Sequence, residues 1–489
     1  MTGARARDVV LVAAPALLAV GLCLIQIDRR SLGFDEAATV AIASEHGAAL
    51  RSAIAHDGGN MSGYYVLLHW LIGAFGHGEL TLRLPSAIAA GLAVALTELL
   101  ALRLFDRRVA LSAGLLMAVS LPLVFWGQSA RSYAFLVALS AGSFLAFVAL
   151  LDSSRPRIAW VVYVLCTTLA LYASLMAVLI VLAQVVAFGW HRTRIRAVGA
   201  AIGAVAALSV PLAILIANRG SGQLFWVPRP NLTAVREVSV ALSSAGLEPS
   251  IRATSTTYAL LVLTLFLLCA AAVGTVAGER RWPGLLVLSW LGVPIALAVG
   301  ESFIGPSIFV PRNLLMVLPT VALLLAWGIA RLPAGWLVLA ALIALRALQL
   351  APAYGVSPED WRAATAYVMQ NANRGDCVAF YPSDGRNAFR YYAGGRPPRS
   401  VLPAVPWADA RAYIENYATL TKPPAGCGRV WLVSSHVGQA NGPARSRANL
   451  ARYRSLLSML AGSYGQPHTR EFGYADAVTV ELFAPRAPG

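Results

Sequence analysis

The sequence predicts a polytopic α-helical membrane protein that ends in a small α/β domain, and three observations support this fold class. Only 13% of the 489 residues are charged, whereas soluble domains contain about 25%. Apolar runs of about 17 to 25 residues recur between Val9 and Leu350, and each can cross a hydrocarbon core of roughly 30 Å. Beyond residue 353 the chain becomes polar and no further run is long enough to span. An ordinary soluble enzyme is therefore excluded.

About eleven runs are expected to cross the membrane. The first lacks a small-residue cleavage pattern, so we expect an uncleaved helix with a cytoplasmic N-terminus. A transmembrane domain of residues 1–352, with its first outer loop at 28–82, would then precede a C-terminal domain of residues 353–489. The predicted spans are 9–27, 84–104, 109–127, 132–151, 158–174, 175–190, 197–217, 256–278, 283–300, 308–330 and 334–351.

The segment 64–75 is short for a span, and its placement sets the orientation of every later helix. If it lies along the outer surface, loop arginines such as Arg107, Arg192 and Arg331 fall on the cytoplasmic side, as the positive-inside rule predicts. We therefore expect an interfacial helix here. The chain is then expected to be a multi-pass protein of the cell membrane, with its C-terminal domain on the extracytoplasmic side.

The formal net charge of +16 comes almost entirely from arginine. In a soluble chain such basicity suggests nucleic acid. Here many arginines lie in short loops between spans, where membrane topology and anionic lipid headgroups account for them. We expect membrane lipids as partners and no nucleic acid.

The C-terminal domain is predicted to be a small α/β unit of about 130 residues. Its expected strands are Cys377–Tyr381, 430–433 and Val478–Phe483, and its expected helices are 358–371 and 386–392. Cys377 and Cys427 each precede one of the first two strands, so pairing of these strands would bring both cysteines near disulfide range. A disulfide would fit an oxidising compartment; the alternative is two unpaired thiols.

Two adjacent carboxylates, Asp35 and Glu36, follow the first span directly. One can take a proton from an acceptor hydroxyl while the other tunes it or holds a cation. Alternatively, Asp35 is an ordinary N-cap, with Glu36 in the first turn of the helix that it begins. These two residues alone do not decide between the interpretations.

A second polar cluster contains His56, Asp57 and Asn60 around a Gly-Gly pair. The glycines would allow close backbone approach to a ligand, and His56 with Asp57 could bind a metal or hold a sugar. The same residues are typical of a plain turn, which is the interpretation that this cluster favours by itself.

Three arginines, Arg83, Arg131 and Arg312, lie near the expected outer membrane face. Charges at membrane depth are costly unless they are paired. A guanidinium binds phosphate through two parallel hydrogen bonds, so a lipid phosphate is a natural partner. The alternative is pairing with Glu79, with Glu301 or with a lipid headgroup.

Two negative observations narrow the function. No phosphate-binding glycine loop is present, and Lys422 is the only lysine, which argues against an ATP-driven pump. The two halves show no inverted repeat with broken helices. A transporter or flippase of lipid-linked glycans therefore remains the weaker alternative to an enzyme.

Six short segments occur in an informative order and spacing: 35–36, 64–70, 79–86, 128–133, 312–314 and 360–362. Together they resemble the GT-C glycosyltransferases that use polyprenyl-phosphate sugars. This superfamily includes the protein O-mannosyltransferases and the lipid A aminoarabinose transferases. The resemblance is good over residues 30–140 and looser elsewhere.

The resemblance implies a fold with about seven shared N-terminal spans, two surface helices in the first outer loop and a lipid-facing cavity. Asp35 would be the catalytic base or a metal-adjacent carboxylate, with Glu36 in support. Many relatives have a His-Pro-Pro motif where this chain reads Asn60-Met61-Ser62, so a role borrowed from that histidine does not transfer. The expected substrate-binding residues are His56, Asp57, Asn60, Tyr64, Arg83, Arg131, Tyr133 and Arg312.

The implied activity is a hexosyl or pentosyl transfer from a polyprenyl-phosphate sugar to a glycan, lipid or protein acceptor on the extracytoplasmic face. Asp35 would deprotonate the acceptor, and single displacement would invert the anomeric carbon. Arginines such as Arg131 and Arg312 would offset charge on the leaving phosphate. A divalent cation at Asp35 and Glu36 stays open, because the sequence shows no His/Cys cluster at metal-ligand spacing.

Overall fold

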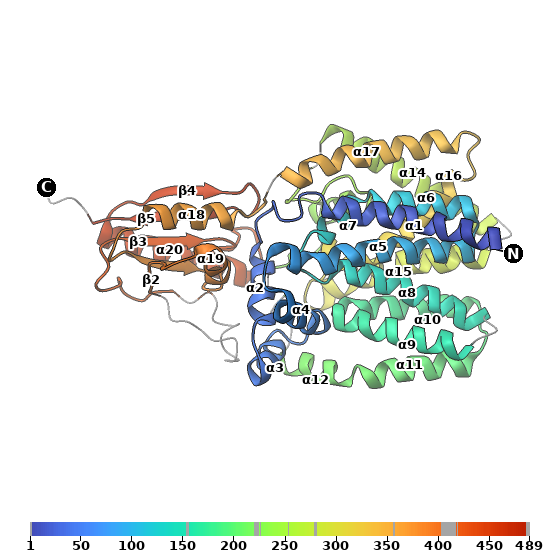
Figure 1. Cartoon of the computed structure of the whole chain (residues 1–489), viewed down its shortest axis with the longest axis horizontal. Helices are drawn as coiled ribbons and strands as arrows, with labels where there is room; N and C mark the ends of the chain where they lie inside the picture. Colours follow the sequence, from blue (N-terminus) through green and yellow to red (C-terminus); the bar gives the residue numbers. More distant parts are fainter. Residues whose placement is uncertain are drawn as a thin grey trace.

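The computed structural model describes residues 2–152, 156–219, 224, 226–252, 254–277, 281–355, 357–401, 417 and 419–485. Long, roughly parallel helices form a bundle, and the C-terminal sheet unit adjoins one end of it (Figure 1). The N-terminus lies at the opposite end of the bundle (Figure 1). Three short helices, α2 (Phe34–Ala43), α3 (Gly47–His56) and α4 (Ser62–Phe75), lie where the bundle meets the sheet unit (Figure 1).

Each predicted span falls on one or two helices of the bundle. These helices are α1 (Thr2–Leu24), α5 (Glu79–Leu104), α6 (Arg107–Ala118), α7 (Leu121–Gly127), α8 (Tyr133–Asp152), α9 (Pro156–Ala173), η1 (Leu175–Ala177), α10 (Val178–Trp190), α11 (Ile195–Leu208), α12 (Val210–Arg219), α14 (Ser255–Ala277), α15 (Arg281–Ile304), η3 (Pro311–Val317), α16 (Leu318–Ile329) and α17 (Gly335–Gly355). One more helix, α13 (Leu232–Leu242), belongs to the loop before α14.

Six helices in the described residues are long and apolar enough to cross a membrane, or up to eight if each of two bent helix pairs is one span. Three further apolar helical stretches are shorter: Val9–Leu24, Leu175–Trp190 and Tyr258–Gly274. The chain is thus a multi-pass membrane protein, whereas the count of eleven spans stays a prediction.

Proline accounts for both bends. The pair α6 and α7 bends by 56°, and the pair α11 and α12 bends by 47°. Pro122 and Pro211 each lie at the second position of the later helix. Proline lacks the N–H that would continue the preceding helix, and its ring clashes with the carbonyl one turn earlier.

The first loop forms a small hydrophobic core of its own, which includes Leu32, Tyr64 and Leu68. Helix α4 covers the segment that we predicted to be interfacial, and it is not among the candidate spans. Trp70 and Phe75 on this helix are 71% and 73% exposed. Such exposed aromatic side chains suit a helix that lies along a membrane surface.

In the described residues of the C-terminal unit, five strands form a mixed sheet in the order β2-β1-β3-β5-β4. Strand β1 is parallel to β2 and β3, whereas β5 is antiparallel to β3 and β4. The predicted strands are confirmed as β1 (Cys377–Tyr381), β3 (Val430–Ser434) and β5 (Val478–Phe483), and the predicted helices as α18 (Trp361–Asn371) and α19 (Gly385–Ala393). The sequence did not indicate β2 (Arg399–Ser400), β4 (His468–Phe472) or α20 (Ala444–Tyr464).

Specific contacts fasten this unit to the first loop. Arg362 at the start of α18 pairs with Glu79 and donates to the backbone oxygens of Asp28 and Arg29, both at 2.8 Å. Tyr392 on α19 also donates to Glu79. The sheet unit is therefore held against the segment that leads into α2. Within the unit, a disulfide joins Cys377 to Cys427.

Candidate active site

The first turn of α2 presents the two adjacent carboxylates. Gly33 is the N-cap of this helix, and its N–H donates to Glu36 Oε2 at 3.1 Å. Glu36, not Asp35, therefore satisfies the exposed backbone donor at the start of the helix, as in a capping box. The capping role that the sequence left open for Asp35 is wrong.

Asp35 meets two guanidinium groups. Its Oδ2 atom lies 2.9 Å from Arg312 Nη1 and 3.6 Å from Arg131 Nη2, and 43% of the side chain is exposed. Desolvation by the surrounding protein would raise the pKa of Asp35, but the positive charges of Arg131 and Arg312 outweigh it and lower the pKa to about 2. The structure thus holds an accessible, ionised carboxylate at this point.

Both arginines are held in place by other groups. Arg131 donates through Nη1 to Thr39 Oγ1 at 2.9 Å and to the backbone oxygen of Asp35 at 3.2 Å. The guanidinium carbon of Arg312 lies 4.5 Å from the ring centre of Trp226, and that of Arg131 lies 5.7 Å from the ring centre of Tyr133. These cation–π contacts orient the two guanidinium groups. Of the predicted site residues, the structure thus brings together Asp35, Arg131, Tyr133 and Arg312.

Glu36 faces the opposite environment. The side chain is buried, and it receives two parallel hydrogen bonds of 3.0 Å from Arg83 and one of 2.7 Å from the Ala130 N–H. Desolvation would raise the pKa of Glu36, but the charge and hydrogen bonds of Arg83 lower it below its usual value. The carboxylate of Glu36 is therefore bonded to protein groups in the interior and has a structural role.

Arg83 does not fit the substrate-binding role that the sequence suggested. The side chain is 0% exposed. Besides its two bonds to Glu36, it donates to the backbone oxygens of Ile27, Arg30 and Ser31 at 2.7, 2.7 and 3.2 Å. All five of its N–H donors are used, so none is left for a lipid phosphate.

The second polar cluster supports the loop. Asp57 Oδ2 accepts from the Tyr65 hydroxyl at 2.8 Å, and Asn60 Oδ1 accepts from the Leu175 N–H at 3.3 Å. Tyr64 is 3% exposed, and its hydroxyl lies 3.2 Å from Ser86 Oγ. These contacts favour the turn interpretation for Asp57 and Asn60 and a structural role for Tyr64. His56 is buried with them at the end of α3.

The C-terminal unit contributes two residues that the sequence did not indicate, Glu359 and His436. Glu359 Oε2 accepts from the Phe34 N–H at 2.7 Å, and its Oε1 lies 3.6 Å from His436 Nε2. The His436 ring lies 5.1 Å from the Phe34 ring. Both residues therefore hold the helix turn that carries Asp35. More than 300 positions separate them from this turn, and no local pattern marks them.

Charge couples His436 to this site. Desolvation would lower the pKa of His436, but the negative charges of Glu359, Asp476 and Asp35 raise it above its usual value, against an opposing effect of Arg312. A protonated His436 would therefore help to keep Asp35 ionised.

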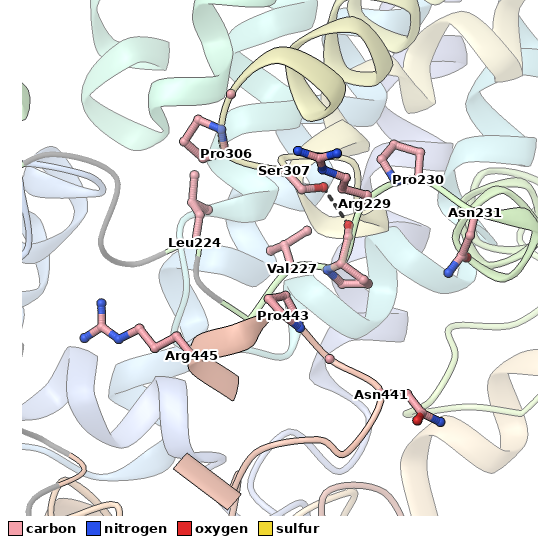
Figure 2. Close-up of a pocket in the computed structure, with 13 residues that line it drawn as sticks. Leu224, Val227, Arg229, Pro230, Asn231, Pro306, Ser307, Asn441, Pro443 and Arg445 are labelled. Carbon is pink, nitrogen blue, oxygen red and sulfur yellow. Dashed lines mark hydrogen bonds between the residues drawn. The ribbon is translucent and has the colours of Figure 1, made fainter. Parts of the chain in front are cut away.

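A cavity of about 780 Å³ lies between the loop before α13, the loop before η3 and the loop before α20. Figure 2 shows Arg229 and Ser307 near each other on the membrane-helix side and Asn441, Pro443 and Arg445 on the sheet-unit side. Ser307 Oγ donates to the backbone oxygen of Pro228 at 2.7 Å (Figure 2). The wall residue Val227 directly follows Trp226, the residue on which Arg312 packs. The cavity is thus linked to Asp35 through Trp226 and Arg312.

Asp35, Glu36 and their surroundings fit a bound metal ion poorly. Within the described part of the chain, no group of three or more His, Cys, Asp or Glu side chains is placed to hold one. Asp35 faces two guanidinium groups, and Glu36 is fully bonded to Arg83 and backbone donors. The two carboxylates therefore cannot share a cation in this arrangement.

No protein-family model matches the chain, and no curated protein sequence matches it. Several solved structures, however, match the chain. ArnT from Cupriavidus metallidurans bound to undecaprenyl phosphate aligns with a TM-score of 0.57 at 14% identity, covering 98% of this chain and 99% of that one. The Archaeoglobus fulgidus oligosaccharyltransferase tethered with an acceptor peptide aligns with a TM-score of 0.55 at 13% identity, covering 94% of this chain and 72% of that one. A second structure from this archaeon, AglB in complex with an inhibitory peptide and a dolichol-phosphate, gives a TM-score of 0.54 at 13% identity over the same shares.

These alignments span almost the whole chain, including the sheet unit in the case of ArnT. The chain therefore has the GT-C membrane fold that the six sequence segments led us to expect. At identities of 13% and 14% the likeness establishes the fold alone. What the chain does has to be argued from its own site.

Proposed function

We propose that this protein is a membrane glycosyltransferase that moves a sugar from a polyprenyl phosphate to an acceptor hydroxyl, with Asp35 as the general base. The observation that carries the proposal is an accessible carboxylate in contact with two arginines at one end of a GT-C fold. ArnT with undecaprenyl phosphate and AglB with dolichol-phosphate support the choice of donor.

The reaction that we propose is a single displacement. The acceptor oxygen attacks the anomeric carbon, the bond from that carbon to the phosphate oxygen breaks, and the electron pair leaves with the phosphate. The acceptor proton passes to Asp35. Attack opposite to the leaving group inverts the anomeric carbon. Arg131 and Arg312 would stabilise the second negative charge that the phosphate gains.

The depressed pKa of Asp35 suggests how the donor would activate the base. A carboxylate with a pKa of about 2 is a weak base, because two guanidinium groups neutralise it. A donor phosphate would attract the same guanidinium groups and draw them from Asp35. The pKa of Asp35 would then rise toward its ordinary value, so that the base becomes effective only when the donor is bound.

The cavity of about 780 Å³ is the place that we propose for the acceptor. Its walls come from both the helix bundle and the sheet unit, so the sheet unit would help to select the acceptor. The disulfide of this unit fits an oxidising compartment. We therefore place the sheet unit on the extracytoplasmic face and the N-terminus in the cytoplasm, as the arginine distribution predicts.

The test is release of free polyprenyl phosphate by the purified full-length protein, offered a panel of polyprenyl-phosphate hexoses and pentoses with crude envelope acceptors. We expect release from one donor, its loss in Asp35→Asn, and normal release in the matched control Asp152→Asn at the exposed end of α8. Release that Asp35→Asn leaves unchanged would overturn the proposal. No release from any donor would favour the flippase alternative.

A further inference from the structure

A second cavity, of about 530 Å³, lies between α2, α4 and α19. Its lining includes Ala37, Val40 and Ala41 of α2 and Ser44, the C-cap residue of this helix. At 3.6 residues per turn these positions lie on the face of α2 opposite to Asp35. The cavity is therefore separated from the candidate active site by the width of the helix, and nothing in the proposed reaction uses it.

The polar side chains that line the cavity are one guanidinium, one amide, three imidazoles, one hydroxyl and one phenol. Helix α19 supplies Asn387 and Arg390, and the first loop supplies His46, His69 and His77. No carboxylate is among the lining residues. A volume of this size is typical of small-molecule sites, and a wall that contains a guanidinium and no acidic group favours an anion.

Two of these residues lack the partners that a purely structural role would require. Asn387 Nδ2 is buried, yet it has no hydrogen-bond partner among the described residues. The exposed Arg390 forms no ion pair within the described part of the chain. Buried donors without a partner are uncommon in proteins. An anion between these residues, which are three positions apart on α19, would satisfy both.

The histidine side of the cavity is pre-arranged. His69 Nδ1 lies 2.9 Å from the backbone oxygen of Ala43, which fixes the ring. His46 packs edge-on against His69, with ring centres 5.0 Å apart. The Tyr391 hydroxyl donates to the backbone oxygen of His77 at 2.7 Å and so ties α19 to this wall. The two walls of the cavity are thus held at a set separation.

The surface beside the cavity is apolar. Ile72 and Gly73 of α4 line it, and on the same helix Val66 and Trp70 are 43% and 71% exposed. An anionic headgroup in the cavity could therefore continue into lipid chains along α4. We infer that this cavity binds a phosphate group, and that the phosphate is presented by a membrane lipid or as a free anion.

The test measures binding to the purified full-length protein in neutral detergent with three probes: dihexanoyl phosphatidic acid, inorganic phosphate and dihexanoyl glycerol. We expect phosphatidic acid to bind and dihexanoyl glycerol, which lacks phosphate, not to bind. Binding of phosphatidic acid alone would identify a lipid source, and equal binding of inorganic phosphate would identify a free anion.

Four variants keep the inference falsifiable. Arg390→Gln and His46→Gln, both exposed positions, should each weaken binding, with Arg390→Gln weakening it about tenfold or more, because a hydrogen bond to a charged group is lost. The control Arg454→Gln on the exposed face of α20 should bind normally. Asp35→Asn should also bind normally, which separates this site from the proposed transfer reaction. Absence of phosphate binding, or equal affinity in Arg390→Gln and Arg454→Gln, would overturn the inference.

Discussion

The two sides of the first turn of α2 differ in exposure and in the partners of their carboxylates. On one side Asp35 is 43% exposed and meets Arg312 and Arg131 at an open position. On the other side Glu36 and Arg83 are buried, and each bonds only to other protein groups. Adjacent residues of identical charge therefore serve different purposes. The buried pair fixes the helix turn, and this leaves Asp35 available for chemistry.

The largest effect on stability is expected from removing one member of the buried pair. Glu36→Ala leaves the Arg83 guanidinium buried without its counter-charge, and such a loss costs about 3–5 kcal/mol of unfolding free energy. Asp35→Ala should cost far less, because Arg131 and Arg312 remain bonded elsewhere or reach solvent. SDS titration of both variants measures the difference in unfolding free energy. Equal losses of unfolding free energy would contradict the distinction between the buried and the exposed carboxylate.

Substitutions beside Asp35 should instead lower the transfer rate and leave stability nearly unchanged. Arg312→Gln removes a donor that faces the proposed leaving phosphate, so the transfer rate should fall about 10²–10³-fold with little change in unfolding. Arg312→Lys keeps the charge but loses the planar fork, so its rate should lie between those of the wild type and Arg312→Gln. The control is Arg196→Gln at the exposed start of α11. A wild-type rate in Arg312→Gln would exclude a role for this guanidinium.

The pH dependence should show the coupling between Asp35 and its arginines. Since the pKa of Asp35 is lowered to about 2 in the free protein, its carboxylate is lost only as the pH falls through that value. The acid limb of kcat/KM should therefore be absent throughout the ordinary acid range. The limb of kcat, which reports the bound complex, should lie at higher pH if the donor phosphate draws the arginines away.

Arg312→Gln should also move the acid limb of kcat/KM upward, because one of the positive charges that lower the pKa of Asp35 is removed. The profile repeated in His436→Gln separates any limb that belongs to the histidine. A kcat/KM profile of Arg312→Gln that stays flat to the same low pH as that of the wild type would contradict this coupling.

The smallest effect is expected for an ion pair outside the site. Arg236 and Glu248 pair at 2.7 Å with side chains 41% and 19% exposed. Pairs at the surface contribute less than about 1 kcal/mol, so Arg236→Ala should be nearly silent in the SDS titration. A loss of unfolding free energy comparable to that of Glu36→Ala would show that burial does not determine how much each ion pair contributes to stability.

The sequence predicted the elements whose signal is local. Apolar length identified the helices, and β-branched and aromatic runs identified β1, β3 and β5. Strand β4 was missed because it lies at the sheet edge, where His468, Thr469, Arg470 and Glu471 are exposed. Helix α20 was missed because few of its residues are buried, so that its pattern of apolar positions is weak.

The site was predictable only in part, for a related reason. Two adjacent carboxylates after the first span marked the turn that the structure places beside Arg131 and Arg312, but the difference between their environments depends on partners far away in the sequence. Arg83 reaches Glu36 across 47 positions, and Arg312 reaches Asp35 across 277. Which arginine becomes buried is decided by packing, and a sequence pattern contains no information on it.

We propose that Asp35 performs chemistry while Glu36 maintains structure, and one paired measurement tests this division most directly. Asp35→Asn and Glu36→Gln are compared side by side for the rate of polyprenyl phosphate release and for unfolding in SDS. We expect Asp35→Asn to lose at least about 10²-fold in rate with wild-type stability, and Glu36→Gln to unfold at lower SDS. An active Asp35→Asn, or an inactive Glu36→Gln that is as stable as the wild type, would contradict the account.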